Sequence, residues 1–454
     1  MVVTRLINRR PRPGLAVALC VLIVATAPTR IHAESRPGGF VIAVIPDTQN
    51  YVDYKQQKTT GFPVDSSALF LEQMRYVADQ AKSAGGDITF AIGLGDMWQH
   101  YSVDMDPDHK ARGFKRTPNP SWPPAAATRS FEIPMVVRGY RMFEGVLPFS
   151  VVPGNHDYDS TWVDAAHPRQ PERRGSAAEG MTHFTGLDNF CSVFSDRSSF
   201  FKGKPWYVGS HDCGADSAQV FEAGGYRFLQ IGLQYHPSDA SLAWAQTIID
   251  KYFGLPTILS THDYLHPDGK PGREVFEDPE RNPPVELWDK FVRRNDQIFL
   301  VLSGHRCAQA YRFDHNDSGH AVHQILTDYQ CRGQTLLDAG MSDIDIGLGD
   351  GWLRLLRFDL GDEPRIHVRT YSTHYKAFST DLPSYVKWYK QRERPTYTDE
   401  EFLAEDDFSI PLTDFRARFG EPRQAGPGPG LASVGRAPLR VLARSARQSS
   451  AKSP

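Results

Sequence analysis

Five apolar runs of this 454-residue chain each end at a polar residue that can bind a metal ion. Short apolar runs bounded by turn residues indicate buried strands, and Gly or Pro at their ends permits a sharp turn. In α/β folds the loops at one end of a sheet gather the functional residues, so we expect the five strand ends to converge on one site. The runs are GFVIAVIP before Asp47, DITFAIGLG before Asp96, FSVVPG before Asn155, PTILST before His262 and QIFLVLSG before His305.

Helices are predicted between these strands, from Ser66 to Ala84 and from Ser241 to Tyr252, because apolar residues recur there at near-helical spacing. The chain is therefore expected to have an α/β fold. The stretches 100–130 and 158–215 are long and rich in Pro, Gly, Asp and Arg, and they are interpreted as insertions that could shape a substrate cleft. The alternating runs GWLRLLRFDL and RIHVRTYST predict antiparallel strands of a second sheet.

The two ends of the chain differ in composition from the rest. Residues 1–33 contain several Arg, then the apolar run from Leu15 to Ala27, then the small residue Ala33, which is the layout of a secretory signal peptide. We therefore expect a secreted or periplasmic protein, with an uncleaved anchor as the alternative, although the run is short for a membrane span. Residues 423–454 are rich in Pro, Gly, Ser and Ala and basic without any acid, which is typical of a disordered tail.

Residues 34–422 are expected to form one domain with a marked negative charge. They contain 40 Lys and Arg against 54 Asp and Glu, a formal charge of about −14. Such a surface disfavours binding to nucleic-acid phosphates. The chain as a whole is 40% hydrophobic and 23% charged, as in globular proteins that bury a full core.

Four cysteines follow the signal segment: Cys191, Cys213, Cys307 and Cys331. Four cysteines allow three pairings in an oxidising compartment, and the pairing closest in sequence joins Cys191 to Cys213 and Cys307 to Cys331. Free buried thiols are the alternative.

The donor types at the strand ends suit two catalytic ions. Carboxylate, amide and imidazole groups are hard or borderline ligands. A structural zinc site is not expected, because the sequence has no cluster of thiolate ligands. The donors are too numerous for one catalytic ion, which keeps an open position, but suit two ions that share a carboxylate and clamp the oxygens of a phosphoryl transfer. Each of these residues could instead be an ordinary turn residue or a structural histidine.

The order of these motifs resembles the calcineurin-like metallophosphoesterase superfamily, over roughly residues 40–375. The similar elements are Asp47-x-Gln49, Gly95-Asp96, Gly154-Asn155-His156-Asp157, His262 and Gly304-His305. The segments DTQNY, DYQ, GWLRLLRF and VRTYS further resemble a secreted branch in which Gln replaces the usual first His.

The resemblance implies a four-layer α/β/β/α sandwich, with two mixed β-sheets flanked by helices. It also implies two divalent or transition-metal ions (Mn, Fe or Zn) and hydrolysis of phosphomonoesters or phosphodiesters by a metal-bridging water. His156 would be the general acid, and Asp157 would orient the turn. The implied metal ligands are Asp47 and Gln49 on the first ion, Asp96 as a bridge, and Asn155, His262 and His305 on the second.

Two departures from the superfamily pattern affect these expectations. The final block is usually Gly-His-x-His, with the second His on the first ion, but here that position is Cys307. A thiolate could bind zinc or iron, whereas a disulfide with Cys331 would withdraw it. The block GDMWQHY lacks the Asp-Arg-Gly of protein phosphatases, which disfavours that activity. The alternative function is a secreted ligand-binding or structural protein that keeps the fold but has lost one metal position.

Overall fold

The computed structural model describes residues 39–101, 105, 107–111, 113, 126–164, 181–272, 281–342 and 347–423. The expected signal peptide and all but the first residue of the expected basic tail lie outside these ranges, as does most of the stretch 100–130. All that follows concerns the described residues.

The first sheet has β1 (Phe40–Ile45) near its centre. Its strand order is β15-β14-β13-β1-β2-β3, and β16 also pairs with β14. Strands β1, β2 and β3 are parallel, and the other neighbours are antiparallel. The further strands are β2 (Ile88–Gly93), β3 (Phe149–Val151), β13 (Trp352–Asp359), β14 (Arg365–Ser372), β15 (Ala377–Phe378) and β16 (Asp407–Pro411).

The placement of β13 and β14 corrects one prediction. The two strands are antiparallel, as their alternating sequences indicate, but they do not belong to a second sheet, because β13 pairs directly with β1. Alternation reports which face of a strand is buried and contains no information about its neighbour.

The second sheet has the order β11-β12-β10-β9-β8-β7-β6. Its four central strands β8, β9, β10 and β12 are parallel, and antiparallel strands complete both sides. The strands are β6 (Tyr207–His211), β7 (Asp216–Ala223), β8 (Tyr226–Leu233), β9 (Thr257–Thr261), β10 (Ile298–Ser303), β11 (Ala308–His315) and β12 (Ala321–Asp328).

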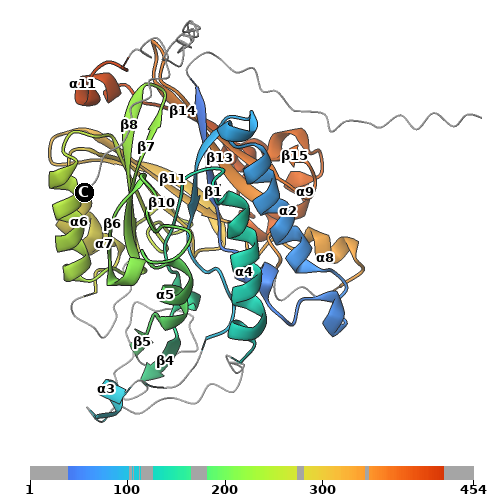
Figure 1. Cartoon of the computed structure of the whole chain (residues 1–454). Coiled ribbons are helices and arrows are strands. Elements are labelled where there is room, and N and C mark those ends of the chain that lie inside the picture. Colours follow the sequence, from blue (N-terminus) through green and yellow to red (C-terminus); the bar gives the residue numbers. More distant parts are fainter. Residues whose placement is uncertain are drawn as a thin grey trace, which may run out of the picture. The chain divides into compact units, whose positions relative to one another are not determined.

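The sheets pack face to face with helices outside them (Figure 1). In β1, Phe40, Ile42 and Val44 join a core shared with Phe228 of β8 and Leu300 of β10. The alternate residues of β1 face a second core containing residues of α2 (Ser66–Asp79) and α4 (Ile133–Tyr140). A third core joins the outer face of the second sheet to α6 (Asp239–Lys251) and α7 (Pro284–Leu287). The expected α/β/β/α sandwich of two mixed sheets is confirmed.

The two long predicted helices are present with shifted ends. Helix α2 ends at Asp79, and a separate short turn covers Lys82–Ala84. Helix α6 begins two residues before the predicted start, where the Ser238 side chain accepts a hydrogen bond from the Ser241 N–H and caps the helix. The other helices are α1 (Gln49–Val52), α3 (Pro107–Ala111), α5 (Asp188–Phe194), α8 (Gln334–Asp338), α9 (Tyr385–Glu393), α10 (Asp399–Ala404) and α11 (Phe415–Phe419).

The stretch 158–215 contains a separate hairpin, β4 (Ser160–Asp164) with β5 (Met181–Thr185), followed by α5 and β6. A disulfide joins Cys191 of α5 to Cys213, and a second one joins Cys307 to Cys331. The pairing closest in sequence is therefore confirmed, and the alternative of free thiols is excluded.

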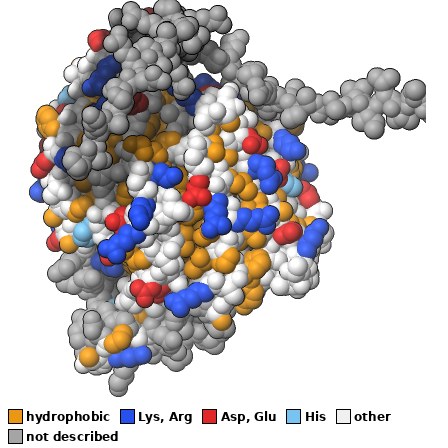
Figure 2. All heavy atoms as spheres, viewed as in Figure 1, with side chains coloured by type: hydrophobic (Ala, Val, Ile, Leu, Met, Phe, Trp, Pro, Cys, Tyr) orange, Lys and Arg blue, Asp and Glu red, His pale blue; other side chains and the backbone are white. Residues whose placement is uncertain are grey.

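Acidic and basic side chains lie side by side among the described residues of the face in Figure 2. Within the described ranges, every helix is too short or too polar to cross a bilayer.

Candidate metal centre

Five strand ends bring the predicted ligands together. Asp47 follows β1, Asp96 follows β2, Asn155 follows β3, His262 follows β9 and His305 follows β10. These strands are parallel within each sheet, so the residues that follow them lie at the carboxyl ends of both sheets.

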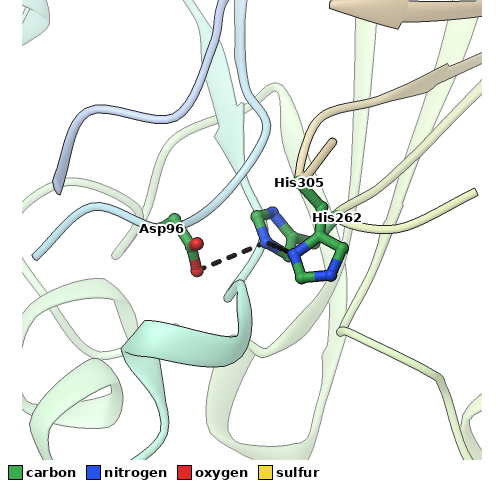
Figure 3. A group of neighbouring side chains, drawn as sticks. All are labelled: Asp96, His262 and His305. Atoms are coloured by element: carbon green, nitrogen blue, oxygen red, sulfur yellow. Dashed lines mark hydrogen bonds and ion pairs between the residues drawn. The ribbon is translucent and has the colours of Figure 1, made fainter. Parts of the chain in front are cut away.

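The first group of donors surrounds the Nε2 atom of His262. This nitrogen lies 3.1 Å from Asn155 Oδ1, 3.1 Å from His305 Nδ1 and 3.3 Å from Asp96 Oδ1. Figure 3 shows the two imidazoles and the carboxylate pointing toward one another. The other ring nitrogen of His262, Nδ1, lies 2.8 Å from the carbonyl oxygen of Leu94. This carbonyl can fix the Nδ1–H tautomer, which leaves Nε2 as the ligand atom.

The second group of donors consists of oxygen-bearing side chains. Asp47 and Gln49 are each 2% exposed. The Gln49 Nε2 donates to Asp96 Oδ2 at 3.2 Å and also to Gln330 Oε1. The Gln330 Nε2 in turn donates to Asp47 Oδ2 at 3.2 Å and to Asp328 Oδ2 at 2.9 Å. Asp96 therefore presents one carboxylate oxygen to each group, as a bridging ligand must.

The backbone is strained at two of the ligand candidates. Asp96 has φ +48° and His305 has φ +70°, in the left-handed region that residues with a Cβ rarely adopt. Gly154 and Gly304 permit close packing beside them, because an added Cβ would clash with Asp96 Oδ1 at Gly154 and with Asp47 Oδ1 at Gly304. The His305 N–H donates to both carboxylate oxygens of Asp47, at 3.2 and 3.1 Å.

The pKa values of the two histidines are shifted in opposite directions. Burial alone would lower the pKa of His262, but the neighbouring carboxylates of Asp96 and Asp47 raise it to about 10. Burial lowers the pKa of His305 to about 3. A proton on His262 thus lies between two imidazole nitrogens and two oxygens, where a metal ion would replace it.

The carboxylates of the oxygen-rich group are crowded. Burial, followed by repulsion from Asp328, raises the pKa of Asp47 well above its usual range. Burial also raises the pKa of Asp328 to about 6. A cation among these carboxylates would reverse both effects.

His156 lies at the edge of the centre with its side chain 22% exposed. Its Nδ1 lies 2.7 Å from the Gln99 carbonyl oxygen, and its Nε2 lies 4.0 Å from Asp96 Oδ2. The ring is therefore anchored at one nitrogen and offers the other to a ligand.

A buried cluster of Asp53, His100 and Glu132 holds the loop that anchors His156. Glu132 accepts hydrogen bonds from the Gln99 and His100 N–H groups at 3.1 Å each, from the Tyr54 N–H at 3.3 Å, and contacts His100 Nδ1 at 2.5 Å. Because the carboxylate of Glu132 is saturated with donors, we interpret the cluster as a structural hydrogen-bond centre.

Asp157 accepts hydrogen bonds from the backbone N–H groups of Met97 at 2.9 Å and Gly154 at 2.8 Å. These two bonds tie the turn after β3 to the turn after β2, in keeping with the orienting role that the resemblance implies. Burial and then repulsion from Asp96 raise the pKa of Asp157 to about 8.

Cys307, at the position of the superfamily's second histidine, is bonded to Cys331. It therefore offers no thiolate to an ion. Asp328 and Gln330 belong to the DYQ segment of the resemblance, but neither was predicted as a metal ligand, although the partly apolar run AVHQILT precedes Asp328.

Comparison with known proteins gives similarities of low identity. No known family profile matches the chain. The chain is 24% identical over 237 residues to the uncharacterized protein YvnB of Bacillus subtilis (strain 168), a match that covers 51% of this chain and 15% of that protein. The chain thus spans only a small part of this curated relative.

Three solved structures are similar to this chain in part. The purple acid phosphatase PPD1 from yellow lupin (Lupinus luteus) seeds has 11% identity and a TM-score of 0.36, covering 76% of this chain and 53% of that chain. PhoD has 9% identity and a TM-score of 0.32, covering 75% and 71%. GAP50, the anchor in the inner membrane complex of Plasmodium, has 11% identity and a TM-score of 0.30, covering 75% and 86%.

Proposed function

We propose that the protein is an exported, metal-dependent hydrolase of phosphomonoester or phosphodiester bonds with a two-ion site. One observation carries the proposal: Asp96 Oδ1 lies 3.3 Å from His262 Nε2, which contacts Asn155 and His305, while Asp96 Oδ2 accepts a hydrogen bond from Gln49. A shared carboxylate between two donor groups is the arrangement that a two-ion phosphoryl-transfer site requires.

The donor atoms fit such ions on two further grounds. The Oε1 atom of Gln49 is buried and has no hydrogen-bond partner among the residues that the structure describes, and a buried oxygen without a partner is costly unless it binds a ligand. Asp47 and Asp96 are at most 2% exposed, and buried carboxylates need cationic partners or metal ions. When bound, two divalent ions would supply charge stabilisation at the phosphoryl oxygens and a water of lowered pKa.

His156 would hold the proton for the leaving group at Nε2. The Gln99 carbonyl occupies Nδ1, so Nε2 is the atom at which the ring gains or loses its proton. This nitrogen lies 4.0 Å from Asp96 Oδ2, so the proton would be held beside the proposed bridging carboxylate. His156 is thus proposed as the general acid, and the exposed part of its ring is the side from which a substrate could approach.

Export is part of the proposal. The Arg-rich and then apolar sequence of residues 1–33 supports it, and so do two disulfides in one chain, since disulfides persist in oxidising compartments.

The alternative is a secreted binding protein that retains the fold with one metal position lost. The disulfide at Cys307 favours this alternative, because it removes the donor expected at the first position. Metal content separates the two functions: about two ions per chain support the hydrolase, and one ion or none supports the binding protein.

The test combines metal analysis with kinetics. Purified mature protein would be analysed by inductively coupled plasma mass spectrometry and assayed with p-nitrophenyl phosphate and bis(p-nitrophenyl) phosphate. We expect Asp96→Asn and His262→Ala to lower kcat by at least about 10²-fold to 10³-fold. The control is His323→Gln, a buried histidine of β12 outside the site, which should keep wild-type kcat. A folded Asp96→Asn variant with wild-type turnover would refute the proposal.

A further inference from the structure

The first metal position lacks one donor when only the predicted ligands are counted. Asp47, Gln49 and the shared Asp96 supply three side chains, and the residue expected to supply a fourth is Cys307, whose sulfur is bonded to Cys331. Another residue must complete this position if it holds an ion.

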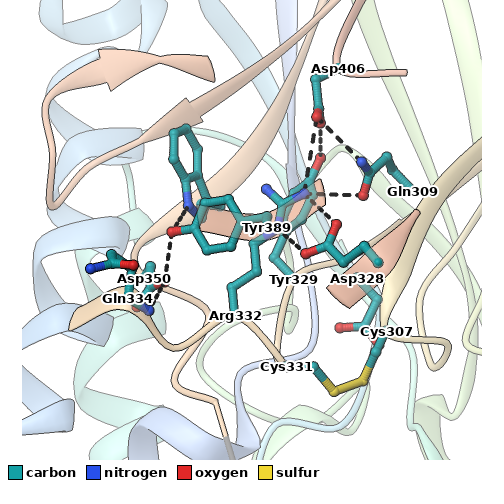
Figure 4. A network of polar contacts seen from close by, with 12 residues as sticks. Cys307, Gln309, Asp328, Tyr329, Cys331, Arg332, Gln334, Asp350, Tyr389 and Asp406 are labelled. Carbon is teal, nitrogen blue, oxygen red and sulfur yellow. Dashed lines mark hydrogen bonds and ion pairs between the residues drawn. A yellow bond between two sulfur atoms is a disulfide. The ribbon is translucent and has the colours of Figure 1, made fainter. Parts of the chain in front are cut away.

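The disulfide itself leads to a candidate. Cys331 belongs to the segment that follows β12, and β12 runs parallel to β10, the strand before His305. The carboxyl end of β12 therefore lies beside that of β10, and it carries Asp328. Figure 4 shows Asp328 and the disulfide in one network of side chains.

Asp328 is 1% exposed and lies next to the oxygen-rich group. Its Oδ2 is 2.9 Å from Gln330 Nε2, which is also 3.2 Å from Asp47 Oδ2. A single amide nitrogen thus lies between two buried carboxylates. The other carboxylate oxygen of Asp328, Oδ1, accepts a hydrogen bond from the Gln330 backbone N–H at 2.9 Å, which fixes the orientation of the carboxylate.

The buried carboxylates near Gln330 Nε2 are expected to attract a cation. Asp47, Asp96 and Asp328 are each at most 2% exposed. Among the described residues, the ion pairs formed by these three carboxylates are those of Asp96 with histidines. Three buried carboxylates that have no Lys or Arg partner within the described ranges are costly unless an ion neutralises them.

Gln49 provides a second, independent observation. Its amide lies against Asp96 and Gln330, and its buried Oε1 has no hydrogen-bond partner in the described part of the chain. Rotation of either amide by half a turn would present an oxygen to the place where an amide nitrogen now contacts the carboxylates.

We propose that Asp328 is the carboxylate that completes the first metal position, in place of the donor lost at Cys307. This inference rests on the proposed function. The first position would then be held by oxygen donors alone, namely Asp47, Gln49, Asp96 and Asp328, with Gln330 beside them. Oxygen donors select hard cations such as Mg²⁺ or Mn²⁺, whereas the imidazoles of the second position suit Zn²⁺ or Fe²⁺. The two positions would therefore differ in the metal they prefer.

The surrounding structure holds this segment in place. Arg332, which is 2% exposed, forms an ion pair with Glu393 of α9 at 2.8 Å and donates to Tyr385 at 2.6 Å. The disulfide fixes the same segment to the loop that follows His305. A ligand presented from such a segment is positioned before an ion arrives.

The experiment measures metal content and metal affinity in the Asp328→Asn variant, whose new side chain has nearly the same size and shape as Asp but no charge. Protein loaded with Mn²⁺ would be analysed by mass spectrometry and by titration with electron paramagnetic resonance detection. We expect about two ions in the wild type and about one in the variant, with affinity at the first position lowered at least about 10-fold to 100-fold. The matched control is Asp216→Asn, a fully buried carboxylate hydrogen-bonded to Gln234, which should retain two ions.

A second variant tests the oxygen-only position without altering Asp328. The double substitution His262→Ala and His305→Ala should retain one Mn²⁺, and electron spin-echo modulation of that ion should show no coupling to imidazole nitrogen. Nitrogen coupling in this variant, or two ions bound with wild-type affinity to folded Asp328→Asn, would overturn the inference.

The outcomes also separate the inference from the proposed function. Hydrolysis with two ions in both wild type and Asp328→Asn would refute the role of Asp328 and leave the hydrolase standing. Wild-type protein that binds no ion would overturn both.

Discussion

The two disulfides allow a matched comparison, because they close loops of nearly equal length but only one lies beside the candidate metal centre. Cys191 and Cys213 are separated by 22 residues, and Cys307 and Cys331 by 24. We consider two variants, each with one pair replaced by alanine.

Chain entropy predicts nearly equal losses of stability. Closing a loop of this size lowers the entropy of the unfolded chain by an amount worth about 3 kcal/mol, and the difference in length between the two loops changes this by less than about 0.1 kcal/mol. Urea unfolding of both variants, each compared with the wild type, measures the two losses.

The effects on the centre should differ. Cys307 lies two residues after His305, and Cys331 directly follows Gln330, so removing this disulfide frees the segments on both sides of the first metal position. We expect Mn²⁺ affinity at that position to fall about 10-fold to 100-fold, as for the loss of supporting contacts around a metal ligand. The Cys191/Cys213 variant should bind Mn²⁺ as the wild type does.

The assay is a Mn²⁺ titration of both variants without urea, at a temperature where both are folded. Hydrolysis of p-nitrophenyl phosphate is measured under the same conditions. Equal losses of Mn²⁺ affinity in the two variants would mean that the disulfide acts only through global stability. Unchanged affinity in the Cys307/Cys331 variant would refute the claim that it positions the segment carrying Asp328.

Two further predictions concern buried titratable groups. Burial lowers the pKa of His323 from 6.5 to about 4, so the unfolded chain binds its proton first and the stability present above pH 6.5 is lost as the pH falls to about 4. The expected loss in the free energy of unfolding is about 3 kcal/mol. Urea unfolding at several pH values should show this loss in the wild type and not in His323→Gln. Parallel curves of unfolding free energy against pH for the two proteins would contradict the prediction. Glu132→Gln should lower kcat about 10²-fold with unchanged metal content, because the Gln99 carbonyl that orients His156 loses its support; wild-type kcat in the folded variant would refute this role.

Much of the fold could be predicted because strand ends leave a local signal. An apolar run that stops at Gly or Pro and continues with a polar donor marks both a buried strand and its functional end, and all five such ends meet in the structure. The order of the runs then restricts the topology, since parallel strands bring their carboxyl ends to one edge.

The parts that could not be predicted depend on pairing between distant segments. The alternation of residues 352–359 shows a strand but not that its partner is β1. A role of Asp328 as a ligand could not be predicted for the same reason, because only the parallel pairing of β12 with β10 brings it to the centre. The support of His156 by a backbone carbonyl has no side-chain signature at all, since any residue at position 99 carries the same group.

The positive φ angles of Asp96 and His305 have a consequence for the speed of metal uptake. Each such residue costs the folded chain about 1–3 kcal/mol, and this cost is met when the chain folds, before any ion is present. An arriving ion therefore finds its donors already facing one another and has no loop to order. Its association rate should be set by the loss of water from its own hydration shell, so slowly exchanging cations should load slowly even where they bind tightly.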